Sequence, residues 1–345
     1  MHQNHIVVLG SSLAGFHTAL ALARALPAHQ VTVISREEEL TLRPSLALLP
    51  FRLRGPGDVS VPARPLLEAH GVRFVHDQAV RVDLGRRTVT TPSGGARYDH
   101  LVVATGAAPN YAAVPGLGPS RYTHSITTLR EAEQTRAALE RLLEAPGPIV
   151  VGALGNGLGY VPAHDFLFTL AGHIRRCGLT LRAPITYLTS ADDVGHLGRT
   201  GLASTIHLDE RLLADLGISM VTRGVVRQVS PGTIHLLDGR SLPFGFAMII
   251  PPFLGVDVMR ACDPITTASG FVRVDDSFRS VVRSEVFAVG AAATTAADPR
   301  SCDPWDAGRW PGPLQEVGET VAAAIAGDIG GGTDARPVEE IASAL

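Results

Sequence analysis

The chain of 345 residues contains no lysine, so all 30 of its basic residues are arginines. This absence excludes chemistry that needs a lysine amine, such as a Schiff base, or the phosphate-binding lysine of a P-loop. Cysteine is scarce, because only Cys177, Cys262 and Cys302 occur, far apart and without a CxxC pair. A disulfide framework, a zinc knuckle and a vicinal redox pair are therefore not expected. We predict no metal site and a reducing, cytoplasmic compartment.

Strong net charge and long apolar runs are also missing. The formal net charge of −3 argues against nucleic acid as the main partner, which requires a clustered basic surface. The longest apolar run, Phe246 to Val256, contains two prolines and is shorter than the roughly 18–20 residues of a membrane helix. The chain reads directly into a strand, without the pattern of a leader segment. We expect no integral membrane segment.

The opening residues contain a glycine-rich turn between apolar segments. His5–Leu9 predicts a buried strand, Phe16–Leu26 a helix with apolar residues at helical spacing, and Val31–Ile34 a second strand. This order is typical of a βαβ unit, whose helix begins next to the turn. The amides at such a helix amino end are unpaired and partly positive, so a dinucleotide pyrophosphate can bind there.

The turn itself follows a GxSxxG pattern. Gly10 and Gly15 permit a sharp turn and a close approach of the backbone, and the hydroxyl of Ser12 can donate to a phosphate oxygen. An acid usually follows the second strand to bind the ribose, but here Ser35 stands there, before glutamates at 37–39. Either Ser35 or one of the glutamates could reach the ribose. A strand–helix turn without a ligand is the alternative interpretation.

A second unit of the same kind follows later in the chain. Ile149–Val151 predicts a strand, 152–159 a glycine-rich turn, Pro162–Arg176 a helix and Ile185–Thr189 another strand. Two such units predict an α/β fold with two Rossmann-like domains, the second inserted in the first. The expected limits are 1–112 with 270–330 for the first domain, 113–269 for the inserted domain and 331–345 for a flexible tail.

The remaining segments give weaker signals. Other expected elements are a loop without clear periodicity over 41–65, a β-meander over 79–91 that turns at 93–95, helices over 128–143 and 314–326, and strands over 98–106, 221–250 and 285–290.

Several stretches resemble one family. YDHLVVATG (98–106), HSITTLREAE (124–133), VGHLG (194–198) and MIIPPFLGVD (248–257) are similar to the sulfide:quinone oxidoreductase and flavocytochrome c sulfide dehydrogenase branch of the two-dinucleotide flavoproteins. They are spread over nearly the whole chain in the family's order. The resemblance implies an FAD domain and an inserted domain that looks like an NAD site but generally does not bind NAD. NAD(P)H binding at the second turn is possible and is not favoured.

The resemblance also implies which residues contact FAD. The implied positions are Gly10, Ser12, Gly15, Ser35, Arg36, Ala79, Thr105, Gly106, Gly290, Ala291 and Gly312. We also expect FAD contacts from Ser11, Ala14, Arg43 and Ala104.

The chain departs from that family at its redox residues. Where the resemblance places cysteines beside the flavin, this chain has Thr127 and Gly159. A third cysteine lies in a C-terminal extension that this chain lacks, together with the family's membrane contact, and Trp310 stands for a basic residue. A persulfide relay needs a thiolate and a second sulfur, so sulfide chemistry by the family mechanism is not expected.

Three other residues are candidates for catalysis. His196 in VGHLG and His124 could move a proton, and Cys302 lies in a loop that approaches the flavin in the family. The alternatives are histidines bonded to backbone and a plain loop cysteine. His164 and Asp165 fit a polar first helical turn.

Three functions remain open from the sequence. The favoured one is a soluble FAD-dependent oxidoreductase that acts on a small molecule. A homodimer is one expected form of the protein. The second is an NAD(P)H-dependent reductase that passes electrons to a partner. The third is a flavoprotein fold with a non-redox role, as a cyclase, isomerase or binding protein, because fold alone does not determine function.

Overall fold

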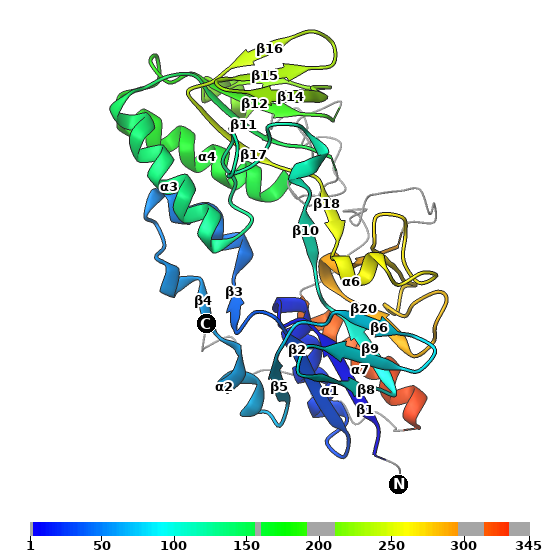
Figure 1. The fold of residues 1–345 in the computed structure, drawn as a ribbon. Coiled ribbons are helices and arrows are strands. Elements are labelled where there is room, and N and C mark those ends of the chain that lie inside the picture. Colours follow the sequence, from blue (N-terminus) through cyan, green and yellow to red (C-terminus); the bar gives the residue numbers. More distant parts are fainter. Residues whose placement is uncertain (1–2, 156–159, 192–210, 296–313, 331–345) are drawn as a thin grey trace.

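The chain folds around two separate parallel sheets. The computed structural model describes residues 3–155, 160–191, 211–295 and 314–330. One sheet lies toward each end of the molecule (Figure 1). The strands of the second sheet fall between the fourth and last strands of the first sheet in sequence. The predicted α/β fold with one nucleotide-fold unit inserted in the other is confirmed.

The first sheet has five parallel strands, in the spatial order β20-β9-β1-β2-β5. Their sequences are nearly continuous apolar runs, as expected for strands that are covered on both faces. The central strand is buried from Ile6 to its end. The strands are β1 (His5–Leu9), β2 (Gln30–Ser35), β5 (Arg73–His76), β9 (His100–Val103) and β20 (Val286–Ala288).

Two helices pack against each other on this sheet: α1 (Leu13–Ala25) and α7 (Leu314–Ile329). Gly318 allows their close approach, because a Cβ there would lie 3.0 Å from the His17 carbonyl. The first helix begins earlier than the predicted Phe16, because Ser12 already has the extended backbone of an N-cap residue.

The second sheet has four parallel strands in the order β13-β12-β11-β17. Helices α3 (Leu129–Glu144) and α4 (Tyr160–Arg176) pack on it around Phe166, Tyr187 and Phe246. An antiparallel sheet, β14-β15-β16, lies beside it. Its strands fall within residues 221–250, where the sequence predicted strands. The strands are β11 (Ile149–Ala153), β12 (Ile185–Thr189), β13 (Ser219–Val221), β14 (Val226–Ser230), β15 (Thr233–Leu236), β16 (Ser241–Pro243) and β17 (Phe246–Ile250).

Two short strands connect the sheets. β10 (Ala107–Pro109) leaves the first sheet directly after Gly106, and β18 (Phe253–Gly255) returns from the second. They pair antiparallel with each other, so the two connections form one ribbon (Figure 1).

The segment 41–65, expected to be an irregular loop, contains regular elements. Its 3-10 helix η1 (Arg43–Phe51) packs against α3 and α4 and contributes Leu46, Leu49 and Phe51 to the core of the second sheet. The pattern was hidden because Pro44 and Pro50 interrupt any helical period. The neighbouring elements are β3 (Glu39–Thr41), η2 (Pro56–Asp58), β4 (Ser60–Pro62) and α2 (Ala63–Glu68).

The meander has three strands, and its second turn differs from the expected one. Gly94 and Gly95 lie in the third strand, so the turn is at Pro92–Ser93. A Cβ on Gly95 would lie 2.2 Å from the Val89 carbonyl oxygen. The glycine is therefore needed for the close approach of the two strands and not for the turn. The remaining elements are β6 (Arg81–Asp83), β7 (Thr88–Thr91), β8 (Gly94–Arg97), η3 (Tyr111–Ala113), α6 (Asp257–Arg260), β19 (Val272–Arg273), η5 (Gly290–Ala292) and β21 (Ala293–Thr294).

Candidate functional site

The turn between β1 and α1 has no room for side chains. Gly10 has a φ of +104°, and a Cβ there would lie 2.5 Å from the Ala104 carbonyl oxygen. A Cβ on Gly15 would lie 2.1 Å from the Gly10 carbonyl oxygen. The backbone of the turn is therefore pressed against the end of β9, as a turn that admits a pyrophosphate requires.

Ser12 caps α1 without using its side chain for the helix. Its Oγ donates to the Ala104 carbonyl oxygen at 3.2 Å, and among the described residues no side chain accepts from the first amides of the helix. The first turn of α1 contains no acidic residue. These amides and the positive end of the helix dipole are thus open to an anion.

The end of β2 is closed by a hydroxyl pair. Ser11 Oγ donates to Ser35 Oγ at 2.8 Å, and the Glu37 amide donates to the same Ser35 oxygen at 3.1 Å. Both serines are buried. Ser35 thus occupies the place where an acid usually binds a ribose.

The three glutamates after Ser35 have other partners. Glu37 accepts from the Arg36 side chain, Glu38 lies 3.0 Å from His76 Nδ1, and Glu39 accepts from Ser60 Oγ at 2.5 Å. In this conformation none of them is free to reach back toward the turn.

The strand ends bring the other implied FAD positions to the same edge. Leu9 is in register with Val103, and Val103 with Ala288, so the carboxyl ends of β1, β9 and β20 are level. The segments after these strands carry Ala104, Thr105, Gly106, Gly290 and Ala291, and Gly290 lies against Ala14 of α1. Ala79 is half-buried after β5, on the far side of β2.

Thr105 has an orphaned buried hydroxyl. Its Oγ1 is buried and finds no hydrogen-bond partner among the described residues. A buried hydroxyl without a partner is costly, so its position indicates a ligand group that completes it. The glycine cradle, the open helix amides and this hydroxyl together fit a dinucleotide such as FAD.

Arg43 lies at the start of η1. Its side chain is exposed, yet desolvation by the surrounding protein lowers the pKa of the guanidinium, opposed by Glu37 and Glu131. Within the described ranges no residue forms a hydrogen bond or ion pair with it. It is an accessible cation between the end of β2 and the beginning of α3.

Thr127 stands in a hydrogen-bonded network. Its Oγ1 donates to Glu131 Oε2 at 2.5 Å, and the Tyr111 hydroxyl donates to Glu131 Oε1 at 2.9 Å. Burial raises the pKa of Tyr111, and the Glu131 charge adds to the shift. Sequence reasoning noticed Thr127 only as a missing cysteine and gave no role to Tyr111 or Glu131. Thr128, three residues before Glu131, matches the capping-box pattern, and this pattern could have drawn attention to Glu131 in the sequence.

His124 is held as a neutral ring. It stacks on Phe246 with a centroid distance of 5.2 Å, and burial lowers its pKa to about 4. At neutral pH the ring is therefore neutral, and His124 remains a candidate catalytic residue. His196, Cys302, Gly312, Gly159 and Trp310 lie outside the described residues.

The described cysteines do not make a reactive site. Cys262 is buried, its thiol donates to the Val258 carbonyl oxygen at 3.1 Å, and burial raises its pKa to about 11. Cys177 is exposed directly after α4. No group of three or more possible metal ligands occurs in the described part of the chain.

The second glycine turn differs from the first. Leu154 follows β11 where Gly10 follows β1, and its side chain is buried in the apolar cluster beside β14 and β15. A Cβ on Gly155 would lie 2.6 Å from the Pro252 ring. A leucine at the first position removes the glycine that the dinucleotide turn uses there.

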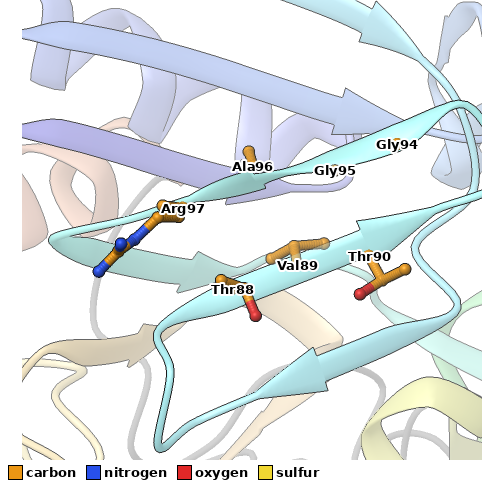
Figure 2. Close-up of a pocket in the computed structure, with 7 residues that line it drawn as sticks. All are labelled: Thr88, Val89, Thr90, Gly94, Gly95, Ala96 and Arg97. Carbon is orange, nitrogen blue, oxygen red and sulfur yellow. The ribbon is translucent and has the colours of Figure 1, made fainter.

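A shallow depression also lies on the meander, away from the strand ends that carry the cradle. Figure 2 shows it between β7 and β8, lined by Thr88–Thr90 and Gly94–Arg97. Its lining contains no acid, histidine or cysteine, so it offers little for catalysis. Among the helices that the structure describes, none is both long and apolar enough to cross a membrane.

Comparison with known proteins agrees with this geometry. Residues 4–158 match the family model described as pyridine nucleotide-disulphide oxidoreductase. Sulfide-quinone reductase of Aquifex aeolicus is 31% identical over 293 residues, which cover 83% of this chain and 67% of the relative. An NADH dehydrogenase-like protein of Mycobacterium tuberculosis is 28% identical, over 85% of this chain and 74% of the relative.

The solved structures show the same relationship. The X-ray structure of the Aquifex aeolicus sulfide:quinone oxidoreductase has a TM-score of 0.84 at 29% identity, covering 94% of this chain and 77% of that one. A ferredoxin reductase from Rhodopseudomonas palustris has a TM-score of 0.71 at 18% identity, over 98% and 78% of the two chains, and shows the fold alone. The predicted FAD-dependent enzyme is confirmed at this level: the chain belongs to the family of FAD-dependent oxidoreductases that includes sulfide-quinone reductase.

Proposed function

We propose that this chain transfers a hydride or electrons between FAD and a small organic molecule, without a cysteine persulfide relay. The observation that carries the proposal is the cradle in which Gly10 and Gly15 exclude side chains next to the orphaned Thr105 hydroxyl. Backbone and hydroxyl donors that lack protein partners match the phosphate and ribityl oxygens of a flavin dinucleotide.

Each part of the cradle has a role toward the cofactor. The α1 amides and Ser12 would bind the pyrophosphate, Ser35 the ribose, and Thr105 and Gly106 the flavin half. When bound, FAD supplies two-electron chemistry that the side chains lack. The remaining proposed contacts are Ser11, Ala14, Arg36, Arg43, Ala79, Ala104, Gly290, Ala291 and Gly312.

The described side chains support chemistry without a thiol. Thr127 is hydrogen-bonded to Glu131, and a thiol with a pKa of about 11, as at Cys262, stays protonated at neutral pH. His196 and Cys302 remain candidate catalytic residues.

The proposal is tested through Thr105. We expect purified protein to show flavin absorbance or to gain it with added FAD. Thr105→Val should weaken FAD binding about fivefold, the equivalent of one lost hydrogen bond of ~1 kcal/mol. The apoprotein should keep its stability, because the variant removes a hydroxyl without a protein partner. A colourless protein that never takes up FAD would contradict the proposal and favour a non-redox role.

A second candidate is an NAD(P)H-dependent reductase for a partner protein, as the names of the relatives suggest. Leu154 argues against it. Anaerobic mixing with NADH, NADPH, sulfide and small thiols separates these readings. Bleaching of the flavin by a nicotinamide would favour the reductase, and rapid bleaching by sulfide would overturn the non-thiol mechanism.

Further expectations accompany this proposal. We propose domain limits at 1–112 with 270–330, and at 113–269, a small-molecule partner and a homodimer. Cytoplasmic location is proposed from the three dispersed cysteines.

A further inference from the structure

Glu131 is a buried carboxylate that the cofactor cradle does not use. It is 5% exposed, in the first turn of α3. Its oxygens accept from the Tyr111 hydroxyl at 2.9 Å, from Thr127 Oγ1 at 2.5 Å and from the Thr127 amide at 3.2 Å. All three donors are neutral, and no cation in the described part of the chain lies within ion-pair distance. A buried charge held only by neutral donors is unusual and requires an explanation.

Helix capping accounts for only part of this arrangement. Thr128 caps α3 by accepting from the Glu131 amide at 3.2 Å, as in a capping box. A capping-box glutamate accepts from the amide of the cap residue itself. Here Glu131 bonds the residue before the cap and also a tyrosine from η3, an element outside the helix.

A third hydroxyl belongs to the same cluster. Ser125 is 0% exposed, and its Oγ has no hydrogen-bond partner within 3.5 Å among the described residues. It lies close enough to the Tyr111 hydroxyl to oppose the effect of burial on the pKa of Tyr111. Three hydroxyls thus gather around one carboxylate, and one of them is unsatisfied.

The network borders the cradle of the first sheet. β10 connects the two regions, because Tyr111 lies five residues after Gly106, at the other end of this short strand. Arg43 interacts electrostatically with both Glu37, after β2, and Glu131. η1 and β17 pack on α3. On η1 the charged group that faces Glu131 is Arg43, and on η3 the titratable group is Tyr111. β17 contains no charged or titratable side chain.

The degree of burial gives the network a direction. Thr127 and Tyr111 are half-buried, whereas Glu131 is buried behind them. Among the described residues, Thr127 and Tyr111 donate to Glu131 through their side chains, so a proton from a molecule at the surface can reach Glu131 through these hydroxyls. Hydroxyls both donate and accept, so they can pass a proton without carrying charge.

We propose that Glu131 accepts, through Thr127, the proton that leaves the substrate during flavin reduction, with Thr127 as the residue that contacts the substrate and Tyr111 as a positioning residue. This rests on the proposed function. The substrate class is a small organic molecule with a C–H bond next to an O–H or N–H group. The C–H bond breaks and its hydride passes to bound oxidised flavin, while the carbon forms a double bond to O or N. The O–H or N–H proton passes to Thr127 Oγ1 as the Thr127 proton passes to Glu131, which becomes a carboxylic acid.

The test measures proton uptake without a substrate. The midpoint potential of the FAD-loaded protein is measured between pH 5 and 9 with reference dyes. If Glu131 gains a proton on reduction, the wild-type potential falls more steeply with pH over one interval. Glu131→Gln should remove that interval. Glu285→Gln is the matched control, since Glu285 is also buried but belongs to another cluster, beside Arg87 and Tyr98.

The outcomes separate the two proposals. A Glu131→Gln protein that binds FAD and keeps the wild-type profile overturns the inference but not the function. If that variant loses FAD, the midpoint potentials of Thr127→Val and Tyr111→Phe are measured instead. A shift in the pH interval of steeper slope in either variant supports the inference, and an unchanged interval in both contradicts it. A wild-type chain that takes up no FAD overturns both proposals.

Discussion

At the scale of single residues, Gly15 makes the sharpest prediction. Its replacement by alanine places a Cβ 2.1 Å from the Gly10 carbonyl oxygen, a backbone atom that cannot move without shifting the turn. We expect Gly15→Ala to lower the free energy of unfolding by about 1–3 kcal/mol, as overpacking does. FAD binding should weaken about tenfold or more, which corresponds to ~1.4 kcal/mol of lost contact. Denaturant unfolding and FAD fluorescence titration measure the two effects.

Gly327 provides the control. It lies within α7, and a Cβ there meets nothing within 4 Å. Gly327→Ala should raise stability by about 0.5–1 kcal/mol through helix propensity. Equal behaviour of the two variants would refute the close packing of the turn.

Residue roles were predictable where backbone conformation demands a residue type. Gly10 and Gly15 are such cases, because the GxSxxG pattern between an apolar strand and a helix predicts the sharp turn. The partners of the glutamates at 37–39 were not predictable, because His76 and Ser60 reach them only through folding. Tyr111 and Glu131 meet for the same reason, across 20 positions.

At the scale of elements, η1 ties the segment after β2 to the second sheet. The Phe51 ring packs on Phe166 at a centroid distance of 5.1 Å and on His173 at 5.7 Å. Phe51→Ala should lower the free energy of unfolding by about 3–5 kcal/mol, because the vacated volume cannot collapse fully. Leu53→Ala, at an exposed position after η1, should change it by less than about 0.5 kcal/mol. Equal losses in urea unfolding would show that η1 is not anchored in this core.

Elements with a clear period were predicted well, and η1 was not. The β1–α1–β2 and β11–α4–β12 units follow from apolar runs and helical spacing in the sequence. The helix η1 has a 3-10 geometry with Pro44 and Pro50, so its buried residues follow no α-helical period. Its packing partner is a core about 80 to 120 positions later in the chain, which local patterns do not encode.

At the scale of the whole molecule, half-buried histidines with lowered pKa values make stability depend on pH. Burial is the main cause that lowers the pKa of each member of this group. They are His5, His17, His100, His124 and His173, and they lie on elements of both sheets. Asp165 acts in the opposite direction, because burial raises its pKa and folding then favours its protonated form.

The histidines predict loss of stability in mild acid. Below the ordinary value of 6.5 the unfolded chain binds protons that the folded chain does not, so the free energy of unfolding falls as pH drops. For His124, with a folded pKa of about 4, the loss between pH 6.5 and 5 is about 1.6 kcal/mol. Melting temperatures measured from pH 7.5 to 5 should therefore decrease steadily. His124→Gln should flatten that decrease, and His70→Gln, at an exposed position, should leave it unchanged. A melting temperature constant over this range, or an equal slope in His124→Gln, would show that the imidazole is not held neutral by the fold.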